Sequence, residues 1–301
     1  MVKLSSALAP AKINLFLRIV GRRSDGYHEL DSLFVPIGVY DRIRLALRPA
    51  NAAAVTVRCN RADLGSATEN LAGRAASAFM DEFGINAEVM IDLEKNIPVG
   101  AGLGGGSSDA GAVLRMLASL ERIADHARLA RLALSLGADV PYFLDPRPAR
   151  VAGIGERIAP LRKFAALDLV VAAPPMQVRT ADVYGALTRG QWSGAARDED
   201  VKALARGALD AKLLVNDLAA PAMALHPEIS ELKALLEGAG AGVAAMSGSG
   251  GAVFGAFASG GDARRCADTL ARLAPRAWVV AAKSAPSPLD AGIGRRVSRG
   301  R

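Results

Sequence analysis

Apolar and polar residues alternate over much of the first sixty positions of the chain, and this period of two predicts strands. Between residues 12 and 20 every second position is apolar, at Ile13, Leu15, Leu17 and Ile19. Because side chains two apart lie on the same face of a strand, the segment has one apolar face. Further strands are predicted by the same reasoning at 32–39, 42–47, 55–59 and 87–93.

A helical period replaces the alternation in the middle of the chain. Four apolar residues between 113 and 120 share one face of a helix that follows a glycine-rich run. Ser107 or Ser108 is its predicted N-cap, since a serine there can accept a hydrogen bond from a free N–H group of the first turn. Two neighbouring helices are predicted, at 68–83 with Thr68 as its N-cap and at 129–136 with Gly137 as its end.

The second half of the chain mixes strands and helices without strict alternation. This order favours an α+β fold in two lobes over a doubly wound parallel sheet. We predict an N-terminal lobe over 1–155, a C-terminal lobe over 156–290 and a basic, disordered tail over 291–301. The predicted strands are 149–154, 167–172, 252–257 and 277–281, and the predicted helices are 180–187, 199–208, 227–237 and 262–273.

The charge of the chain is concentrated at one end. The 301 residues carry a formal net charge of +7, which by itself would suggest a nucleic acid as partner. The last eleven residues contain four arginines and no acidic residue, so the first 290 residues carry only +3. An RNA-binding protein would need a basic stripe with stacking aromatics, and aromatic residues make up only 5% of the chain. We expect no nucleic-acid partner, and RNA binding stays a distant alternative.

The cysteine content indicates the cellular compartment, and one uncharged segment has the length of a membrane span. Cys59 and Cys266 cannot form a disulfide framework, and no secretory signal is expected, so we predict a cytoplasmic protein. The uncharged segment 238–261 is long enough to span a membrane. Nine of its 24 residues are glycine and three are serine, so we predict a turn, a strand and a glycine loop there, and no membrane association.

The densest chemical signal is the glycine-rich run that leads into the predicted helix at 113–120. Five glycines in seven residues let the backbone approach a ligand closely, and the following helix start adds free N–H donors. Together they predict a polyphosphate site, whereas a flexible linker would not lie between a strand and an amphipathic helix. The expected contacts are Pro98, Val99, Gly100, Ala101, Gly102, Leu103, Gly104, Gly105, Gly106, Ser107 and Ser108.

Two well-known phosphate loops do not fit this run. The Walker A form requires a Gly-Lys-Ser/Thr sequence, and residues 98–108 contain no lysine. In the dinucleotide fold the strand leads directly into the first glycine, but here residues 94–98 intervene. The run is therefore a third kind of phosphate cradle.

Three segments together resemble the motifs of the GHMP kinase superfamily. Residues 98–110 resemble its nucleotide-binding motif, 9–15 its N-terminal motif and 246–254 its C-terminal glycine motif. The resemblance implies two lobes with the active site in the cleft between them, ATP as co-substrate and Mg²⁺, for which no carboxylate pair close in sequence identifies the ligands. Monomer and homodimer both remain open.

Four shorter motifs resemble one branch of that superfamily. They are G-Y-H-E-L at 26–30, L-G-A-D-V-P at 136–141, G-I-G-E at 153–156 and N-D-L at 216–218. The branch phosphorylates the 2-hydroxyl of a cytidine diphosphate-linked methylerythritol in the non-mevalonate route to isopentenyl diphosphate. Another superfamily kinase, acting on homoserine or mevalonate, is the nearest alternative.

The resemblance gives two residues a catalytic role. It implies that Asp139 is the base for the attacked hydroxyl and that Lys12 pairs with it and stabilises charge on the transferring group. Without the family, Asp139 before Pro141 is typical of a helix N-cap, and Lys12 of an exposed strand lysine. Asn14 lies on the same strand face as Lys12 and either binds substrate or faces solvent.

Substrate contacts are implied at four other positions. Tyr27 and His28 offer an aromatic face and an imidazole to a cytosine base. Thr180 would lie near the accepting hydroxyl. The C-terminal glycine motif would close the site from the second lobe with Gly248, Ser249 and Gly250.

Two positions depart from the family pattern. Gly111 stands in the predicted helix where small alanines are usual, and a glycine there weakens a helix by up to ~1 kcal/mol. Ala219 stands where an acid often follows N-D-L, and we assign it no role.

Overall fold

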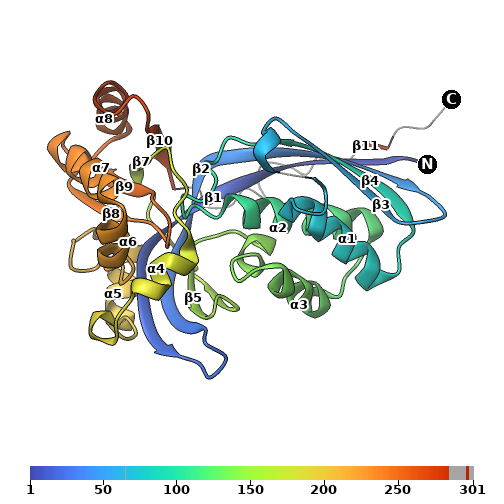
Figure 1. Cartoon of the computed structure of the whole chain (residues 1–301), viewed down its shortest axis with the longest axis horizontal. Helices are drawn as coiled ribbons and strands as arrows, with labels where there is room; N and C mark the ends of the chain where they lie inside the picture. The colour runs from blue at the N-terminus through green and yellow to red at the C-terminus, as the bar shows by residue number, and fades with distance from the viewer. Residues whose placement is uncertain (65, 285–295, 298–301) are drawn as a thin grey trace.

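Two long antiparallel strands organise the molecule, which the computed structural model describes over residues 1–64, 66–284 and 296–297. Strands β1 (Lys3–Arg22) and β2 (His28–Pro49) run from the end that bears the N-terminus to the C-terminal helices (Figure 1). The predicted strands 32–39 and 42–47 both lie within β2. Its register against β1 shifts between Pro10 and Ala11, so the two predicted strands are one strand with an irregularity.

The larger of two sheets contains seven strands in the described part of the chain. Its order is β11-β1-β2-β4-β3, with β5 paired to β2 and β6 paired to β5. Strands β3 and β4 are parallel, and the other pairs are antiparallel. The further strands are β3 (Ala54–Cys59), β4 (Ala87–Glu94), β5 (Ala149–Gly153), β6 (Arg157–Pro160) and β11 (Arg296–Val297).

Helices pack on one face of this sheet (Figure 1). Phe79, Val89, Val113 and Leu117 belong to one buried cluster, which joins two of the helices to the sheet by burial of apolar area. The elements on this face are α1 (Leu71–Phe83), α2 (Gly105–Glu121), α3 (His126–Leu136) and the 3₁₀ turn η2 (Pro141–Leu144). A further 3₁₀ turn, η1 (Ala62–Leu64), lies between β3 and α1 in the chain.

The predicted N-caps of the first two helices are wrong, although the helices themselves form. The side chain of Asn70, not Thr68, accepts a hydrogen bond from the first turn of α1. The N-cap of α2 is Gly104, whose φ of 72° is left-handed, and no side chain caps that end. Ser107 and Ser108 lie inside the helix, because the glycine run continues directly into its first turn.

The smaller sheet is antiparallel and carries helices of the C-terminal half. Its strand order is β10-β7-β9-β8. The uncharged segment 238–261 contains the predicted turn, strand and glycine loop, together with a second short strand that was not predicted. No helix among the described residues is long and apolar enough to cross a membrane. The strands are β7 (Asp168–Ala173), β8 (Val243–Met246), β9 (Val253–Phe257) and β10 (Trp278–Lys283). The helices are α4 (Thr180–Ala186), η3 (Arg189–Gln191), α5 (Asp198–Ala205), α6 (Ala219–Leu225), α7 (Pro227–Gly238) and α8 (Gly260–Leu273).

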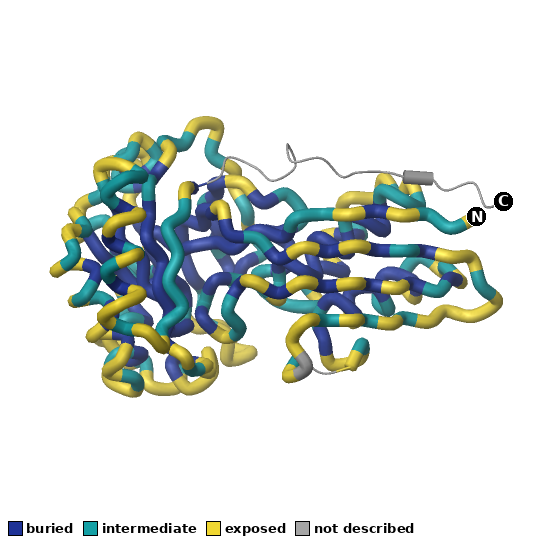
Figure 2. Tube along the Cα trace, turned by 90° about the horizontal axis from the view of Figure 1, so that it is seen from above, coloured by how far each residue is buried: buried dark blue, intermediate teal, exposed yellow. Residues whose placement is uncertain are grey.

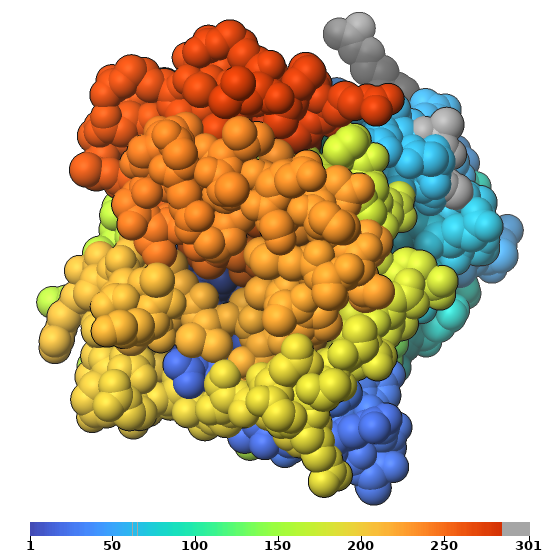
Figure 3. All heavy atoms as spheres, turned by 60° about the vertical axis from the view of Figure 1, so that its left-hand side comes forward, coloured from blue at the N-terminus to red at the C-terminus, as the bar shows by residue number. Residues whose placement is uncertain are grey.

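The two sheets share one buried core. Ile13 and Leu33 of the hairpin belong to the same cluster as Leu169 and Phe254 of the smaller sheet. Buried residues accordingly continue from one half into the other (Figure 2). In Figure 3 the C-terminal segments (yellow to red) form the near face, and atoms from the start of the chain (blue) lie in a hollow between them.

The change from one sheet to the other falls between β6 and β7, at residues 161–167. The division into lobes at 155 and 156 stays a prediction. The predicted tail at 291–301 lies outside the described residues, apart from the two residues of β11, which pair with Lys3 and Leu4.

Candidate active site

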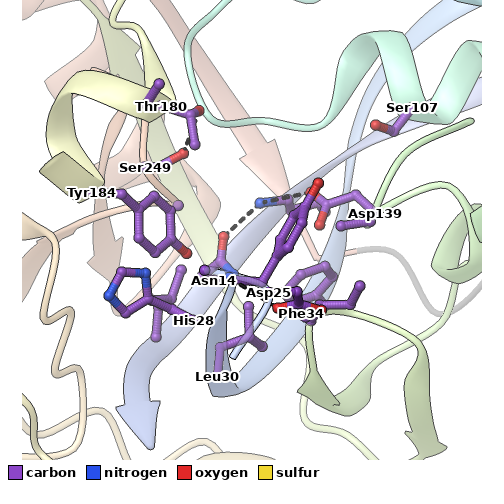
Figure 4. A pocket seen from close by; sticks show the side chains of 18 residues that line it. Asn14, Asp25, His28, Leu30, Phe34, Ser107, Asp139, Thr180, Tyr184 and Ser249 are labelled. Carbon is purple, nitrogen blue, oxygen red and sulfur yellow. Dashed lines mark hydrogen bonds and ion pairs between the residues drawn. The ribbon is translucent and has the colours of Figure 1, made fainter. Parts of the chain in front are cut away.

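Nine of the predicted site residues line one cavity between the two halves, with a volume of about 660 Å³ (Figure 4). They come from segments far apart in the chain: β1, the turn before β2 and the first residue of β2, α2, the segment before η2, α4 and the turn between β8 and β9. The nine are Lys12, Asn14, Tyr27, His28, Ser107, Asp139, Thr180, Gly248 and Ser249.

Lys12 is buried, so the interpretation as an exposed strand lysine is wrong. Its side chain is 4% exposed, and Nζ donates to Asn14 Oδ1 at 2.6 Å and to the carbonyl of Gly102 at 2.9 Å. Nζ also lies 3.7 Å from Asp139 Oδ2 and 4.8 Å from the ring centre of Phe34. Burial lowers the pKa of Lys12, and the charge of Asp139 opposes that shift.

Asn14 is buried and hydrogen-bonded through both its side chain and its backbone, so its interpretation as a solvated residue is also wrong. It is 1% exposed, its Nδ2 donates to Ser32 Oγ at 2.8 Å, and its backbone N–H donates to Ser247 Oγ at 3.1 Å. With the amide nitrogen committed to Ser32, the oxygen faces Lys12. Asn14 therefore orients the ammonium group as well as lining the cavity.

Asp139 is the carboxylate that faces Lys12 across the cavity, and its side chain is 32% exposed. It does not cap a helix, because η2 is preceded by Val140 and has no side-chain cap. The G-I-G-E turn supports this position. A Cβ on Gly155, whose φ is 136°, would lie 2.4 Å from the carbonyl oxygen of Ala138, and Glu156 accepts the backbone N–H groups of Ile154 and Gly155.

The glycine run lines a second cavity of about 200 Å³ with every residue from 98 to 106. Gly102 and Gly104 have left-handed φ values of 83° and 72°. A Cβ on Gly102 would lie 2.6 Å from the carbonyl oxygen of Ser247, and one on Gly104 would lie 2.8 Å from the ring of Phe143. Both positions therefore require glycine. Ser108 is fully buried beneath the run.

Sequence reasoning missed a buried ion cluster beside the glycine run. Lys95 Nζ hydrogen-bonds to Asp41 and, at 2.7 Å, to Asp109 Oδ2, and all three side chains are at most 4% exposed. Burial raises the pKa of Asp109 to about 8, against the charge of Lys95. Asp41 also accepts the backbone N–H groups of Asn96 and Ile97, so the cluster anchors both ends of the run. The adjacency of Lys95 and Asp109 to the run was the available signal.

Aromatic residues from both halves meet at the far end of the larger cavity. His28 stacks on Tyr184 with ring centres 5.2 Å apart, and Trp192 approaches His28 edge-on at 5.7 Å. Tyr27 is 61% exposed, and Tyr184, which the sequence did not single out, lines the cavity beside Thr180. Burial and the nearby charge of Arg22 lower the pKa of His28, which favours the neutral imidazole.

The C-terminal glycine motif contributes to the site in two ways. Gly248 and Ser249 line the larger cavity, and Ser249 Oγ lies 2.8 Å from Thr180 Oγ1. Gly250 lines neither cavity: a Cβ there would lie 2.2 Å from the backbone of the glycine run, so this glycine allows two loops to touch. Asn216 of the N-D-L motif holds the turn by donating to the carbonyls of Met246 and Gly248.

The chain is similar to kinases over most of its length. The description "GHMP kinases N terminal domain" matches residues 70–145, and "GHMP kinases C terminal" matches 194–276. A 4-diphosphocytidyl-2-C-methyl-D-erythritol kinase of Anaeromyxobacter sp. (strain K) is 48% identical over 86% of this chain and 83% of its own. The enzyme of the same name from Mesorhizobium japonicum is 40% identical over 94% and 96%.

Solved structures show the same fold. A crystal structure of 4-(cytidine 5'-diphospho)-2C-methyl-D-erythritol kinase has a TM-score of 0.78 and 40% identity, covering 93% of this chain and 99% of that one. Homoserine kinase from Cytophaga hutchinsonii has a TM-score of 0.71 at 17% identity, covering 95% of each chain, and shares the fold alone.

Proposed function

Because the chain belongs to the 4-diphosphocytidyl-2-C-methyl-D-erythritol kinases of the GHMP kinase family, we propose that it transfers the γ-phosphoryl group of ATP to the 2-hydroxyl of that cytidine substrate. The product would serve the non-mevalonate route to isopentenyl diphosphate. The observation that carries the proposal is the pairing of Lys12 with Asp139 in a cavity adjoining the glycine run. The α+β fold and the kinase family predicted from sequence are confirmed.

Asp139 is the proposed base. The acceptor oxygen forms a bond to the γ-phosphorus while the bond to the β–γ bridging oxygen breaks, and ADP leaves. The hydroxyl proton passes to the carboxylate of Asp139. Lys12, 3.7 Å away, pairs with that carboxylate and offsets negative charge that develops on the transferring group.

The glycine run is the proposed cradle for the ATP phosphates. Its left-handed glycines and the first turn of α2 present backbone N–H groups, and the positive end of the helix dipole favours anions. Lys95 lines the same cavity but is committed to Asp41 and Asp109, so its proposed part is to hold the run in place.

Mg²⁺ fits the residues present as an ion held chiefly by phosphate oxygens and water. Ser107, in the first turn of α2, lines the same cavity and would be its protein ligand, while Asp139 remains available to accept the hydroxyl proton. Among the described residues, no group of three or more His, Cys, Asp or Glu side chains could hold a metal alone. Bound Mg²⁺ would neutralise charge on the transferring phosphate.

The aromatic end of the cavity is the proposed site of the cytidine base. Tyr27, Tyr184 and His28 offer ring faces for stacking, and the neutral imidazole of His28 can donate one hydrogen bond and accept another. Thr180 and Ser249, which hydrogen-bond to each other at one side of the cavity, would position the methylerythritol end (Figure 4).

The remaining proposals concern the cellular compartment and the oligomeric state of the enzyme. Cys59 and Cys266 are both free thiols, which suits a reducing cytoplasm. We propose a cytoplasmic enzyme that acts on small molecules as a monomer or homodimer, and sedimentation at several concentrations distinguishes the two states.

A coupled assay of ADP release tests the function. The cytidine substrate should be turned over, while homoserine and mevalonate should give no more than background rates. Asp139→Asn should fold normally and lose on the order of 10²–10⁴ in kcat, the range for a general base. Turnover of homoserine or mevalonate in preference to the cytidine substrate, or near-normal kcat in Asp139→Asn, would contradict the proposal.

A further inference from the structure

A pocket of about 830 Å³ lies outside the active site, between α2, α3 and η2. Leu129 and Ala130 of α3 and Pro141 and Leu144 of η2 give it apolar walls. Three arginines, Arg115, Arg122 and Arg147, also line it. The mechanism proposed above uses none of these residues.

The guanidinium of Arg115 lies in this pocket without hydrogen bonds on two of its nitrogens. Within the described part of the chain, the buried atoms Nε and Nη2 have no partner, and neither has Asp145 Oδ1. Burial lowers the pKa of Arg115 to about 10, and only the charge of Asp145 opposes that shift. Leaving a buried charged donor unpaired is costly. Because Nε and Nη2 are themselves buried, a ligand would meet the charge of Arg115 through the part of the side chain that lines the pocket.

The charges of the pocket favour a phosphate over a single carboxylate. Asp145 is already paired with Arg147. Arg122 ends α2 with a left-handed φ of 56°, and no ion pair to it is found among the described residues. The pocket thus presents the charges of Arg115 and Arg122 in excess, and guanidinium groups match phosphate oxygens in geometry.

We propose that this pocket is a second ligand site, which binds an organic phosphate with an apolar body. The phosphate lies against Arg115 and Arg122, and the apolar body lies against Leu129, Pro141 and Leu144. The proposal rests on the pocket and the excess positive charge of its lining, and holds whichever alcohol the kinase phosphorylates.

The shared element η2 connects this pocket with the active site. Phe143 of η2 packs against Gly104 of the glycine run, since a Cβ on that glycine would lie 2.8 Å from its ring. Tyr142 of η2 packs edge-on against Phe34, which lies beneath Lys12. A ligand that contacts Pro141 and Leu144 therefore acts on the segment that follows Asp139, and its binding changes turnover.

Calorimetric titration with isopentenyl diphosphate tests the site, with the kinase site filled by a non-hydrolysable ATP analogue and the cytidine substrate. Wild type should bind one equivalent, on the order of tenfold more tightly than inorganic diphosphate, because the five-carbon body is buried. Arg115→Gln and Arg122→Gln should each weaken binding about tenfold or more. Arg131→Gln, which removes an exposed arginine of α3 outside the pocket, should leave binding unchanged.

Initial rates provide the second measurement. At saturating substrates and an isopentenyl diphosphate concentration near its Kd for wild type, kcat should change in wild type and in Arg131→Gln and much less in Arg122→Gln. Arg122 is exposed, so its replacement should not disturb folding. No binding to wild type, or equal weakening in Arg131→Gln, would overturn the site. Binding without any change in kcat would overturn the connection through η2.

Discussion

Lys12 illustrates how one buried charge depends on its neighbours. Water is replaced around its ammonium group by Asn14 Oδ1, the carbonyl of Gly102 and, more distantly, Asp139. Burial outweighs these partners, so the pKa of Lys12 is lowered from 10.5. The protonated form is the one that can offset phosphoryl charge, so activity requires a pH below the lowered pKa.

We therefore predict that kcat falls as the pH rises through the lowered pKa of Lys12, at a lower pH than for an exposed lysine. Lys12→Arg should retain part of the activity and lose this alkaline decline, because a guanidinium stays protonated above pH ~12. Lys12→Ala should lose on the order of 10²–10³ in kcat with a smaller change in KM for ATP. The pH profiles of kcat test this; an alkaline decline that persists unchanged in Lys12→Arg would show that another group titrates.

At the scale of single residues, the sequence predicted which side chains come together better than it predicted how buried they are. Lys12 and Asp139 meet as expected, but no local pattern could show that Lys12 is buried, because its burial depends on Gly102 and Phe34 from other segments. Tyr184 was overlooked for the same reason, since its place beside His28 arises only when the two halves pack.

At the scale of elements, helix α2 contains Gly111, a position where helix propensity and tertiary packing have opposite effects on stability. By helix propensity alone, Gly111→Ala should stabilise the protein by up to ~1 kcal/mol. A Cβ at this position, however, would lie 2.6 Å from Cβ of Phe143 and 2.9 Å from its carbonyl oxygen. The departure from the family's alanine is therefore explained by the close packing of η2 on α2.

We predict that Gly111→Ala lowers the free energy of unfolding by about 1–3 kcal/mol, the usual cost of overpacking. Gly185→Ala in α4 is the matched control, because nothing lies within 4 Å of the added Cβ. It should be neutral or stabilise by up to ~1 kcal/mol. Urea unfolding of both variants measures the difference, and a Gly111→Ala protein as stable as wild type would show that η2 moves aside freely.

Most elements could be predicted from periodicity, but their ends could not. The helix at 126–136 and the strand at 87–94 lie within a few residues of their predicted positions. The predicted caps were wrong where the backbone replaced a side chain, as at Gly104. Helix α6 (Ala219–Leu225) was missed because its sequence, A-A-P-A-M-A-L, has no polar residue and therefore shows no helical period.

Across the whole molecule, contacts between the halves hold the site together. Asp217 accepts the backbone N–H groups of Ile19 and Ser193, which fixes the end of β1 to the C-terminal half. Sequence patterns predict two lobes but cannot show such contacts, since each joins residues at least 24 positions apart. The shared core around Ile13 and Phe254 adds apolar burial to these bonds.

A second contact between the halves offers a test of their coupling. Asp31, 3% exposed, accepts two hydrogen bonds from Arg150 at 2.8 and 2.7 Å and one from the backbone N–H of Ala196 at 2.8 Å. Asp31→Asn would leave Arg150 without its buried counter-charge. We predict a loss of about 2–3 kcal/mol of unfolding free energy, below the ~3–5 of a fully buried pair because Arg150 is 25% exposed.

The control uses the other carboxylate on the same arginine. Asp198 accepts from Arg150 at 2.7 Å but is 74% exposed, so Asp198→Asn should change stability by less than ~1 kcal/mol. Calorimetric melting should show a single transition in wild type and in both variants, displaced to a lower Tm only in Asp31→Asn, because one core joins the two sheets. Two separate transitions would mean that the halves unfold independently and that the cavity between them depends on Asp31 more than on the shared core.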